Sequence, residues 1–222
     1  MSEITLADIE LMLKTVAATA LRNEKYFSEL DAAAGDADFG VSLASGFKVI
    51  QQDFDQLDKS SIGNLLLRTS MVITSKVGGC SGPIWGTGFM RAGMLTKEQS
   101  TLSLEDVEKM LAASIEGIKK RGGADAGDKT LLDALIPIHE VVSDSCGKDV
   151  SLAEVLQQAT RVANEAIDRT LDWVAKRGRQ QFTGERSKGT PDPGIVAIAT
   201  MMNDLCEAFG VENDAAVAAA KH

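Results

Sequence analysis

The sequence has little of what secreted, membrane-bound or nucleic-acid-binding proteins usually depend on. Aromatic residues make up 5% of its 222 residues, and it has only two histidines and three cysteines. Its 32 acidic side chains outnumber its 23 basic ones, which gives a net charge of −9. Because an acidic body repels phosphate-rich surfaces, we expect neither nucleic acid nor an anionic membrane as a partner. Any anion that the protein binds must therefore meet a local group of basic residues.

Long hydrophobic runs are also missing. The longest stretch without charge runs from Val77 to Met90, well short of the roughly 20 apolar residues that a membrane-spanning helix needs. The first ten residues, MSEITLADIE, carry acids where a secretory signal carries basic residues. Cys80, Cys146 and Cys206 are too far apart for a CxxC metal or redox motif. We expect a protein of the reducing cytoplasm that has no targeting segment.

The patterns that are present indicate helices almost throughout. Apolar residues recur at intervals of three and four, and prolines are few. Three pairs, Thr5 with Asp8, Ser103 with Asp106 and Ser151 with Glu154, have the spacing of a capping box at a helix start. The expected helices cover about 6–22, a short stretch before 31, 41–56, 61–76, 84–97, 104–120, 130–145 with a bend at Pro137, 152–177, and 193–209 with Pro193 at its start.

This reading predicts an all-α protein of about eight helices in one domain, residues 1–212, followed by an alanine-rich tail, residues 213–222. The glycines are concentrated in four loops between the expected helices. Ordinary turns need fewer glycines, so we expect the four loops to carry the chemistry.

The first loop, DAAAGDADFG, brings Asp31, Asp36 and Asp38 together around a glycine. Three carboxylates repel one another unless a cation neutralises them, and hard oxygen ligands suit Mg²⁺ or Ca²⁺. The alternative is that each aspartate caps a turn or a helix start. The twelve-residue spacing of an EF-hand is missing.

The second loop, VGGCSGPIWG, precedes a helix and offers backbone N–H groups that can cradle a phosphate. It lacks the Gly-Lys-Ser/Thr ending of a Walker A motif. A tight crossing of two helices explains the small residues equally well. Cys80 is either a reactive thiol or a buried structural one.

The fourth loop, KRGRQQFTGERSKGTPDPG, holds most of the positive charge found in the four glycine-rich loops. Lys176 and Arg177 fit the end of a helix, where cations complement the helix dipole. Arg179 and Arg186 lie beyond that helix, where a guanidinium group suits phosphate oxygens. Together with the third loop, RGGADAGDKT, these features predict a Mg-nucleotide site at one end of a helical bundle. His139 lies on an apolar stretch, which favours a structural role.

The four loops together resemble the nucleotide-binding L subunit of dihydroxyacetone kinases. GDADFG is similar to the family's GDGDxG, and GGCSGPIWGTGFMRAG to its GG-x-SG segment. GGADAGDKTLLDALIP is similar to GDKT-x-LDAL-x-P, and GRQQFTGERSKGTPDPG to GRA-x-Y-x-GERS-x-G-x-x-DPG. The resemblance spans nearly the whole chain and implies an eight-helix antiparallel barrel whose loops hold an adenine nucleotide, ATP or ADP, with two Mg²⁺ ions.

The resemblance also implies roles for single residues. Asp31, Asp36 and Asp38 would hold the metal, and Arg179 would act with them in catalysis. The residues implied to bind the cofactor are Phe39, Gly40, Ser42, Cys80, Ser81, Gly122, Thr130, Leu131, Arg179, Asp192 and Pro193.

Two departures from the family pattern leave the phosphoryl donor open. Many members have histidine and asparagine where this chain has Phe39 and Ser42. One hypothesis is a subunit that transfers phosphate from Mg-ATP to dihydroxyacetone, or a related short ketose, held on a separate K subunit. A second is a carrier of the phosphotransferase system with ADP as a bound coenzyme, and a third is a non-catalytic helical module. The family also allows a phosphotransferase donor subunit and a homodimer as partners.

Overall fold

The computed structural model describes residues 3–33 and 35–213, and its regular structure is almost entirely helical. The helices are α1 (Leu6–Arg22), α2 (Glu24–Ala32), α3 (Phe39–Gln52), α4 (Ile62–Lys76), α5 (Ser81–Leu95), α6 (Leu104–Gly122), α7 (Leu132–Ser145), α8 (Leu152–Thr170) and α9 (Pro193–Ala208). Two short 3-10 helices, η1 (Phe54–Gln56) and η2 (Arg179–Ser187), and one antiparallel strand pair, β1 (Ile4–Thr5) with β2 (Thr101–Leu102), complete the elements of the described residues. The all-α prediction is confirmed, whereas the expected tail falls, from residue 214 onward, outside the described residues.

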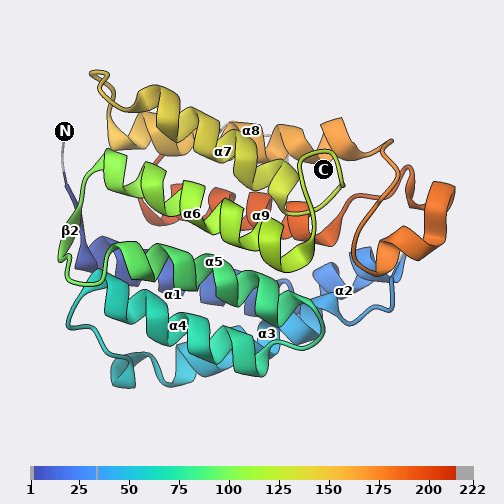
Figure 1. The fold of residues 1–222 in the computed structure, drawn as a ribbon, viewed down its shortest axis with the longest axis horizontal. Coiled ribbons are helices and arrows are strands. Elements are labelled where there is room, and N and C mark those ends of the chain that lie inside the picture. Colours follow the sequence, from blue (N-terminus) through green and yellow to red (C-terminus); the bar gives the residue numbers. More distant parts are fainter. Residues whose placement is uncertain (1–2, 34, 214–222) are drawn as a thin grey trace.

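Eight of the helices form a closed ring, which confirms the predicted antiparallel barrel (Figure 1). Helix α1 packs on α3, α3 on α4, each later helix on the next, and α9 returns to α1. The short α2 packs outside this ring against α3 and α9. Buried side chains such as Leu13, Phe47, Leu65 and Ile195 fill the interior. Burial of this apolar surface is the main force that holds the ring closed.

The helix starts follow the signals in the sequence. All three predicted capping boxes are present, with each Ser or Thr hydroxyl accepting from the third helical N–H and the acid accepting from the cap N–H. Helix α9 begins with Asp192 as its cap, whose carboxylate accepts from Ile195 N at 3.0 Å, and with Pro193 in its first turn. Such caps satisfy N–H groups that have no partner inside the helix.

Pro137 lies inside α7, where it removes one hydrogen bond of the helix. The carbonyl that loses its donor is that of Asp133, four residues earlier, and Arg169 Nη2 of α8 donates to it at 2.8 Å. The proline is therefore tolerated because a neighbouring helix supplies the missing donor.

The largest error in the predicted boundaries concerns α8, which ends at Thr170 and not near Arg177. The next residues leave the helix because their carbonyl groups find partners elsewhere. Leu171 O accepts from Gly189 N at 2.9 Å and from Lys129 Nζ at 2.9 Å. Lys176 and Arg177 consequently lie in a loop, so their charges do not complement the α8 dipole.

Successive helices of the ring run in alternating directions, so the connections alternate between its two ends (Figure 1). The segments 35–38, 77–80, 123–131 and 171–192 all lie at the end opposite β1 and β2. These are the four glycine-rich loops, and the ring brings them together although they are far apart in the chain. None of the described helices is long and apolar enough to cross a membrane.

Candidate functional site

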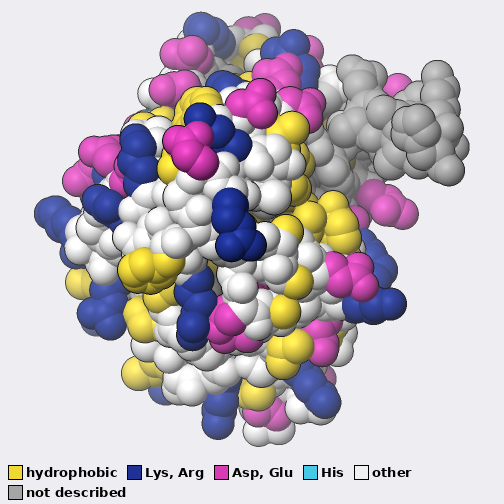
Figure 2. Space-filling model, turned by 90° about the vertical axis from the view of Figure 1, so that its right-hand side faces the viewer, with side chains coloured by type: hydrophobic (Ala, Val, Ile, Leu, Met, Phe, Trp, Pro, Cys, Tyr) yellow, Lys and Arg dark blue, Asp and Glu magenta, His cyan; other side chains and the backbone are white. Residues whose placement is uncertain are grey.

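A cavity of about 510 Å³ opens between the four loops. This volume lies within the usual range of small-molecule and cofactor sites. Figure 2 shows the loop end of the molecule, where basic and acidic side chains lie interspersed around an area of backbone and small side chains. All four loops contribute to the lining, so the cavity exists only because the barrel gathers them.

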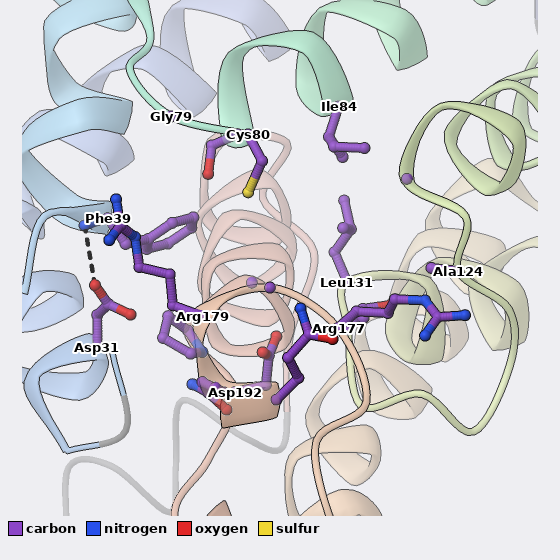
Figure 3. Close-up of a pocket in the computed structure, with 18 of the residues that line it drawn as sticks. Asp31, Phe39, Gly79, Cys80, Ile84, Ala124, Leu131, Arg177, Arg179 and Asp192 are labelled. Atoms are coloured by element: carbon purple, nitrogen blue, oxygen red, sulfur yellow. Dashed lines mark hydrogen bonds between the residues drawn. The ribbon is translucent and has the colours of Figure 1, made fainter. Parts of the chain in front are cut away.

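Three carboxylates form one side of the cavity. Asp31 is in the last turn of α2, and Asp36 and Asp38 follow in the loop; their ligand oxygens lie within 4.8 Å of one another. The Asp31 carboxylate accepts from the backbone N–H groups of Asp38 and Phe39 at 3.1 and 3.4 Å, and Figure 3 shows this side chain facing the cavity. Ala37 adopts a positive φ of 63°, a strained conformation for a residue other than glycine. The backbone is thus bent so that two neighbouring carboxylates converge.

The electrostatics of this group favour a bound cation. Desolvation raises the pKa of Asp38, and the charges of Asp36 and Asp31 raise it further, while Arg179 lowers it. A divalent cation would remove this repulsion, and hard carboxylate oxygens are the ligands that Mg²⁺ and Ca²⁺ prefer. The three residues therefore fit a site for such an ion.

Arg179, the first residue of η2, reaches the acidic side from the opposite loop. Its Nε lies 2.9 Å from Asp36 Oδ2, and its side chain is 62% exposed. Figure 3 shows the guanidinium group extended across the cavity toward the side of Asp31. An anion placed between the carboxylates and this loop would therefore meet a guanidinium group, which suits phosphate oxygens.

The second loop combines residues that face the cavity with a tight crossing of two helices, and a phosphate-binding role for it stays a prediction. Gly79 has a φ of 60°, and Cys80 and Ser81 line the cavity at the start of α5. Further along, a Cβ at Gly82 would lie 2.3 Å from Val77 O, and one at Gly86 would lie 2.0 Å from Thr74 Oγ1. The later glycines are thus required for a tight helix crossing, while the residues before them face the cavity.

The other side of the cavity is apolar. Ile84 of α5 and Leu131 before α7 point toward one another, with Ala124 nearby (Figure 3). A Cβ at Gly122 would lie 3.0 Å from Ile84 Cδ1, so this glycine keeps the space open. An apolar slot opposite a charged side suits a ligand with an aromatic ring at one end and anionic groups at the other.

Asp192 and Pro193 close the base of the cavity. Desolvation raises the pKa of Asp192 to about 7, although the backbone N–H groups of Ile195 and Gly194 and the charge of Lys129 lower it. A carboxyl group with this pKa is partly protonated near neutral pH, so it is able to donate a hydrogen bond as well as accept one. Thr130 lies on the same side and also lines the cavity.

Two predicted cofactor-binding residues lie apart from the rest. The described residues that line the cavity do not include Gly40 or Ser42. Gly40 is buried against α2, where a Cβ would lie 1.9 Å from Glu24 O, and Ser42 Oγ lies under Gly78. The structure thus gives these positions a packing explanation, and a binding role for them stays a prediction. Arg186 is exposed outside the cavity.

Other residues of the site were not identified from the sequence. Asp133 is 4% exposed and accepts from the N–H groups of Gly127 and Thr130 at 2.7 and 2.9 Å, which shapes the third loop. Gln180 is 5% exposed, and neither of its amide atoms has a hydrogen-bond partner among the described residues. Lys129 is buried beneath the fourth loop. The signal that could have identified them is the density of polar residues in loops that must pack on each other.

Comparison with known proteins adds independent information. The model of the DAK2 domain matches residues 33–207. The chain is 35% identical over 181 residues to the ADP-binding subunit DhaL of the PEP-dependent dihydroxyacetone kinase of Escherichia coli, covering 82% of this chain and 86% of that protein. It is 32% identical to the L-erythrulose 1-kinase of Mycolicibacterium smegmatis, covering 90% of this chain and 35% of that protein.

Solved structures show the same fold. The dihydroxyacetone kinase of C. freundii in complex with AMP-PNP and Mg²⁺ matches with a TM-score of 0.70 and 26% identity. The match covers 94% of this chain and 35% of that one, and the native form of the same enzyme matches with a TM-score of 0.72. The chain therefore spans about a third of the length of these larger kinases.

Proposed function

The chain belongs to the DAK2 domain family, and on that premise we propose that it is the nucleotide-binding subunit of a kinase for dihydroxyacetone or a related short ketose. It would present a phosphoryl group to substrate held on a separate K subunit. The observation that carries this proposal is a cavity in which three carboxylates face Arg179, with an apolar slot on the other side. The names of the relatives, an ADP-binding subunit and two ketose kinases, support the same assignment.

The residues of the cavity divide the work by their chemistry. Asp31, Asp36 and Asp38 would hold Mg²⁺, which we propose as two ions, and Mg²⁺ supplies charge neutralisation for the phosphates. Arg179 would bind the phosphate end and offset the charge that shifts during transfer. Cys80 and Ser81 would contact the phosphates through the backbone of the second loop.

The adenosine part would occupy the apolar side. Gly122, Thr130 and Leu131 would enclose the adenine and the ribose, and Asp192 and Pro193 would line the cavity beside them. Phe39 lies beside Phe27, with ring centroids 6.2 Å apart, and also lines the cavity. A phenyl ring at this place neither donates to nor accepts from a phosphate, so the chemistry must rest on the metal and Arg179.

Two phosphoryl donors fit this geometry. Free Mg-ATP is the first candidate. The second is a phosphotransferase donor subunit that rephosphorylates bound ADP, and the name of the E. coli relative, which is PEP-dependent and ADP-binding, favours it. A cytoplasmic enzyme with a K subunit as partner agrees with both.

A reconstituted assay tests the proposal and separates the donors. The purified chain is dialysed and its retained nucleotide measured, and phosphorylation of dihydroxyacetone is then followed with and without a K subunit, first with ATP and then with a phosphotransferase donor. We expect activity only when the K subunit is present. Stoichiometric ADP after dialysis with no turnover of ATP would identify the carrier, and failure to bind Mg-ADP in calorimetry would leave a non-catalytic module.

A further inference from the structure

Lys129 lies in the third loop but does not face the cavity. It is 1% exposed, and its Nζ donates to the carbonyl oxygens of Leu171, Trp173 and Ser187 at 2.9, 3.0 and 2.7 Å. An ammonium group has three N–H donors. All three are used by backbone carbonyls, so no donor is left for a phosphate. A lysine in a nucleotide loop would ordinarily be assigned to the phosphates, and the geometry excludes that role here.

The three carbonyls lie at the two ends of one segment. Leu171 and Trp173 follow the end of α8, and Ser187 ends η2. Two more hydrogen bonds join the same ends, from Gly189 N to Leu171 O and from Ala175 N to Ser187 Oγ, both 2.9 Å. We call Lys129, the five residues Leu171, Trp173, Ala175, Ser187 and Gly189, and the five hydrogen bonds among them the neck. The chain between its two ends, including η2, is a loop closed at its base.

The neck closes the base of the segment that carries Arg179. Between the two ends, Gly178 and Gly184 have φ values of 65° and 54°, conformations that glycine adopts freely. A segment with such glycines has many alternative conformations when its ends are released. Arg179 follows Gly178 directly, so the conformation of this segment sets where its guanidinium group lies relative to Asp36.

A buried ammonium group is costly, which argues that its bonds matter to the loop. Desolvation lowers the pKa of Lys129, and the charges of Asp192 and Asp172 oppose that shift. Lys129 also has a φ of 60°, a backbone conformation that is strained for any residue other than glycine. An apolar side chain would avoid the cost of charge burial but not that of the positive φ, and it would leave three carbonyls without this donor.

We propose that Lys129 is a positioning residue for phosphoryl transfer: it fixes the neck, and through the neck it holds Arg179 over the phosphate end of the cavity without touching the nucleotide. The effect on transfer rests on the proposed function. The effect on the loop does not, because it is a property of the protein without ligand.

The first part of the test uses the nucleotide-free protein. Lys129→Met keeps the length of the side chain and removes its donors, Lys129→Arg keeps charge and donors, and Lys120→Met removes an exposed lysine as a matched control. We expect hydrogen exchange at the N–H groups of Ala175 and Gly189 to rise about tenfold or more in Lys129→Met, less in Lys129→Arg, and not in Lys120→Met. Equal exchange in parent and Lys129→Met, or a uniform rise over all helices, would overturn the proposal.

The second part is a double-mutant cycle in the reconstituted kinase. Lys129→Met should lower kcat about 10- to 100-fold with KM for the nucleotide within about threefold, since misplacing a reacting group costs rate before affinity. When Arg179→Ala is already present, Lys129→Met should cost less than about twofold more. Fully additive losses contradict the proposal.

Two safeguards keep the test decisive. If Lys129→Met does not fold, Ser187→Ala, which removes the acceptor of Ala175 N from the same neck, is expected to give the same pattern more weakly, and parent-like exchange and kcat in that variant reject the idea. If no variant or parent shows transfer, the proposed function fails, while the exchange data still decide whether Lys129 fixes the neck.

Discussion

The two charged loops of the cavity are built in opposite ways. The basic loop, residues 171–192, is cross-linked to the third loop: Lys176 Nζ donates to Gly127 O at 2.9 Å, and Arg177 Nε donates to Gly123 O at 2.5 Å. The acidic loop, residues 35–38 with Asp31 of α2, has its carboxylates gathered within 4.8 Å, and desolvation together with the charges of Asp36 and Asp31 raises the pKa of Asp38. Among the described residues, the ion pair that joins the two loops is that of Arg179 with Asp36.

This difference shows which part of the site the protein completes by itself. Lys176 and Arg177 of the basic loop donate hydrogen bonds to backbone carbonyls in the ligand-free protein, so their positions are fixed before a ligand binds. The carboxylates of the acidic loop are held close against their own repulsion, so a bound cation would stabilise them. Preorganised positive groups and an incomplete negative group are what a metal–phosphate ligand requires.

Removal of a carboxylate from the acidic loop should have the largest effect on ligand binding. Asp36→Ala or Asp38→Ala should abolish binding of Mg-ADP, a loss of about 1000-fold or more, because a metal ion held by these carboxylates would lose a ligand. The nucleotide-free protein should not lose thermal stability, since one repulsive charge is gone. Calorimetry and thermal melting measure the two effects.

The matched control for these variants is Asp55→Ala at the other end of the barrel, whose side chain is 99% exposed. It should bind Mg-ADP as the parent does. If Asp36→Ala also binds normally, the acidic loop is not the metal site.

Removal of Arg179 should have a smaller effect, and it should lower the rate of transfer more than the affinity for the nucleotide. Arg179→Ala is expected to lower kcat about 100-fold and to weaken nucleotide binding less, because a cation near the transferred group acts most strongly where charge shifts in the transition state. Its ion pair with Asp36 is largely exposed, so the free energy of unfolding should change by less than about 1 kcal/mol. Equal losses in kcat and affinity would mean that Arg179 only binds the ground state.

The sequence predicted the acidic side of this comparison better than the basic side. Asp31, Asp36 and Asp38 lie within eight residues, so local spacing alone indicated a cluster. The helix starts were predictable for the same reason, because a capping box is a local interaction over three residues. The all-α class followed from periodicity along the whole chain.

The arrangement of the basic loop was not predictable from local patterns. Lys176 and Arg177 were assigned to the end of a helix because nothing nearby in the sequence shows that Lys129, more than 40 residues earlier, bonds to Leu171 O and Trp173 O. Those bonds end α8 and open the loop. Contacts between segments that are distant in the sequence determine the structure here, and local sequence patterns do not reveal such contacts.

Asp192, which joins the two sides at the base of the cavity, gives a prediction that depends on pH. Its pKa is raised from 3.8 to about 7 by desolvation. Between these values the unfolded chain releases a proton that the folded protein keeps, so stability falls as the pH rises from 4 to 7 and then stays level. Asp192→Asn keeps a good helix cap but has no such charge.

We therefore expect this variant to match the parent near pH 4 and to be more stable at pH 8. The full shift corresponds to about 1.4 kcal/mol per pKa unit, and partial exposure of the side chain reduces this to about 2 kcal/mol in total. Urea unfolding at both pH values measures it. A constant difference between the two proteins would show that Asp192 is ionised throughout this range.

The smallest expected effect concerns the side-chain amide of Gln180 in the basic loop, which has no hydrogen-bond partner among the described residues. Gln180 follows Arg179, and its buried amide has neither donor nor acceptor partner among the described residues. Burying an unpaired amide costs about 1 kcal/mol or more. Gln180→Met, which has similar volume and no polar groups, should therefore raise the free energy of unfolding by about 1 kcal/mol, while the exposed neighbour Gln181→Met should change nothing. A loss of stability in Gln180→Met would show that this amide makes hydrogen bonds in solution. The buried amide of the basic loop would then be paired without a ligand, as its cations are.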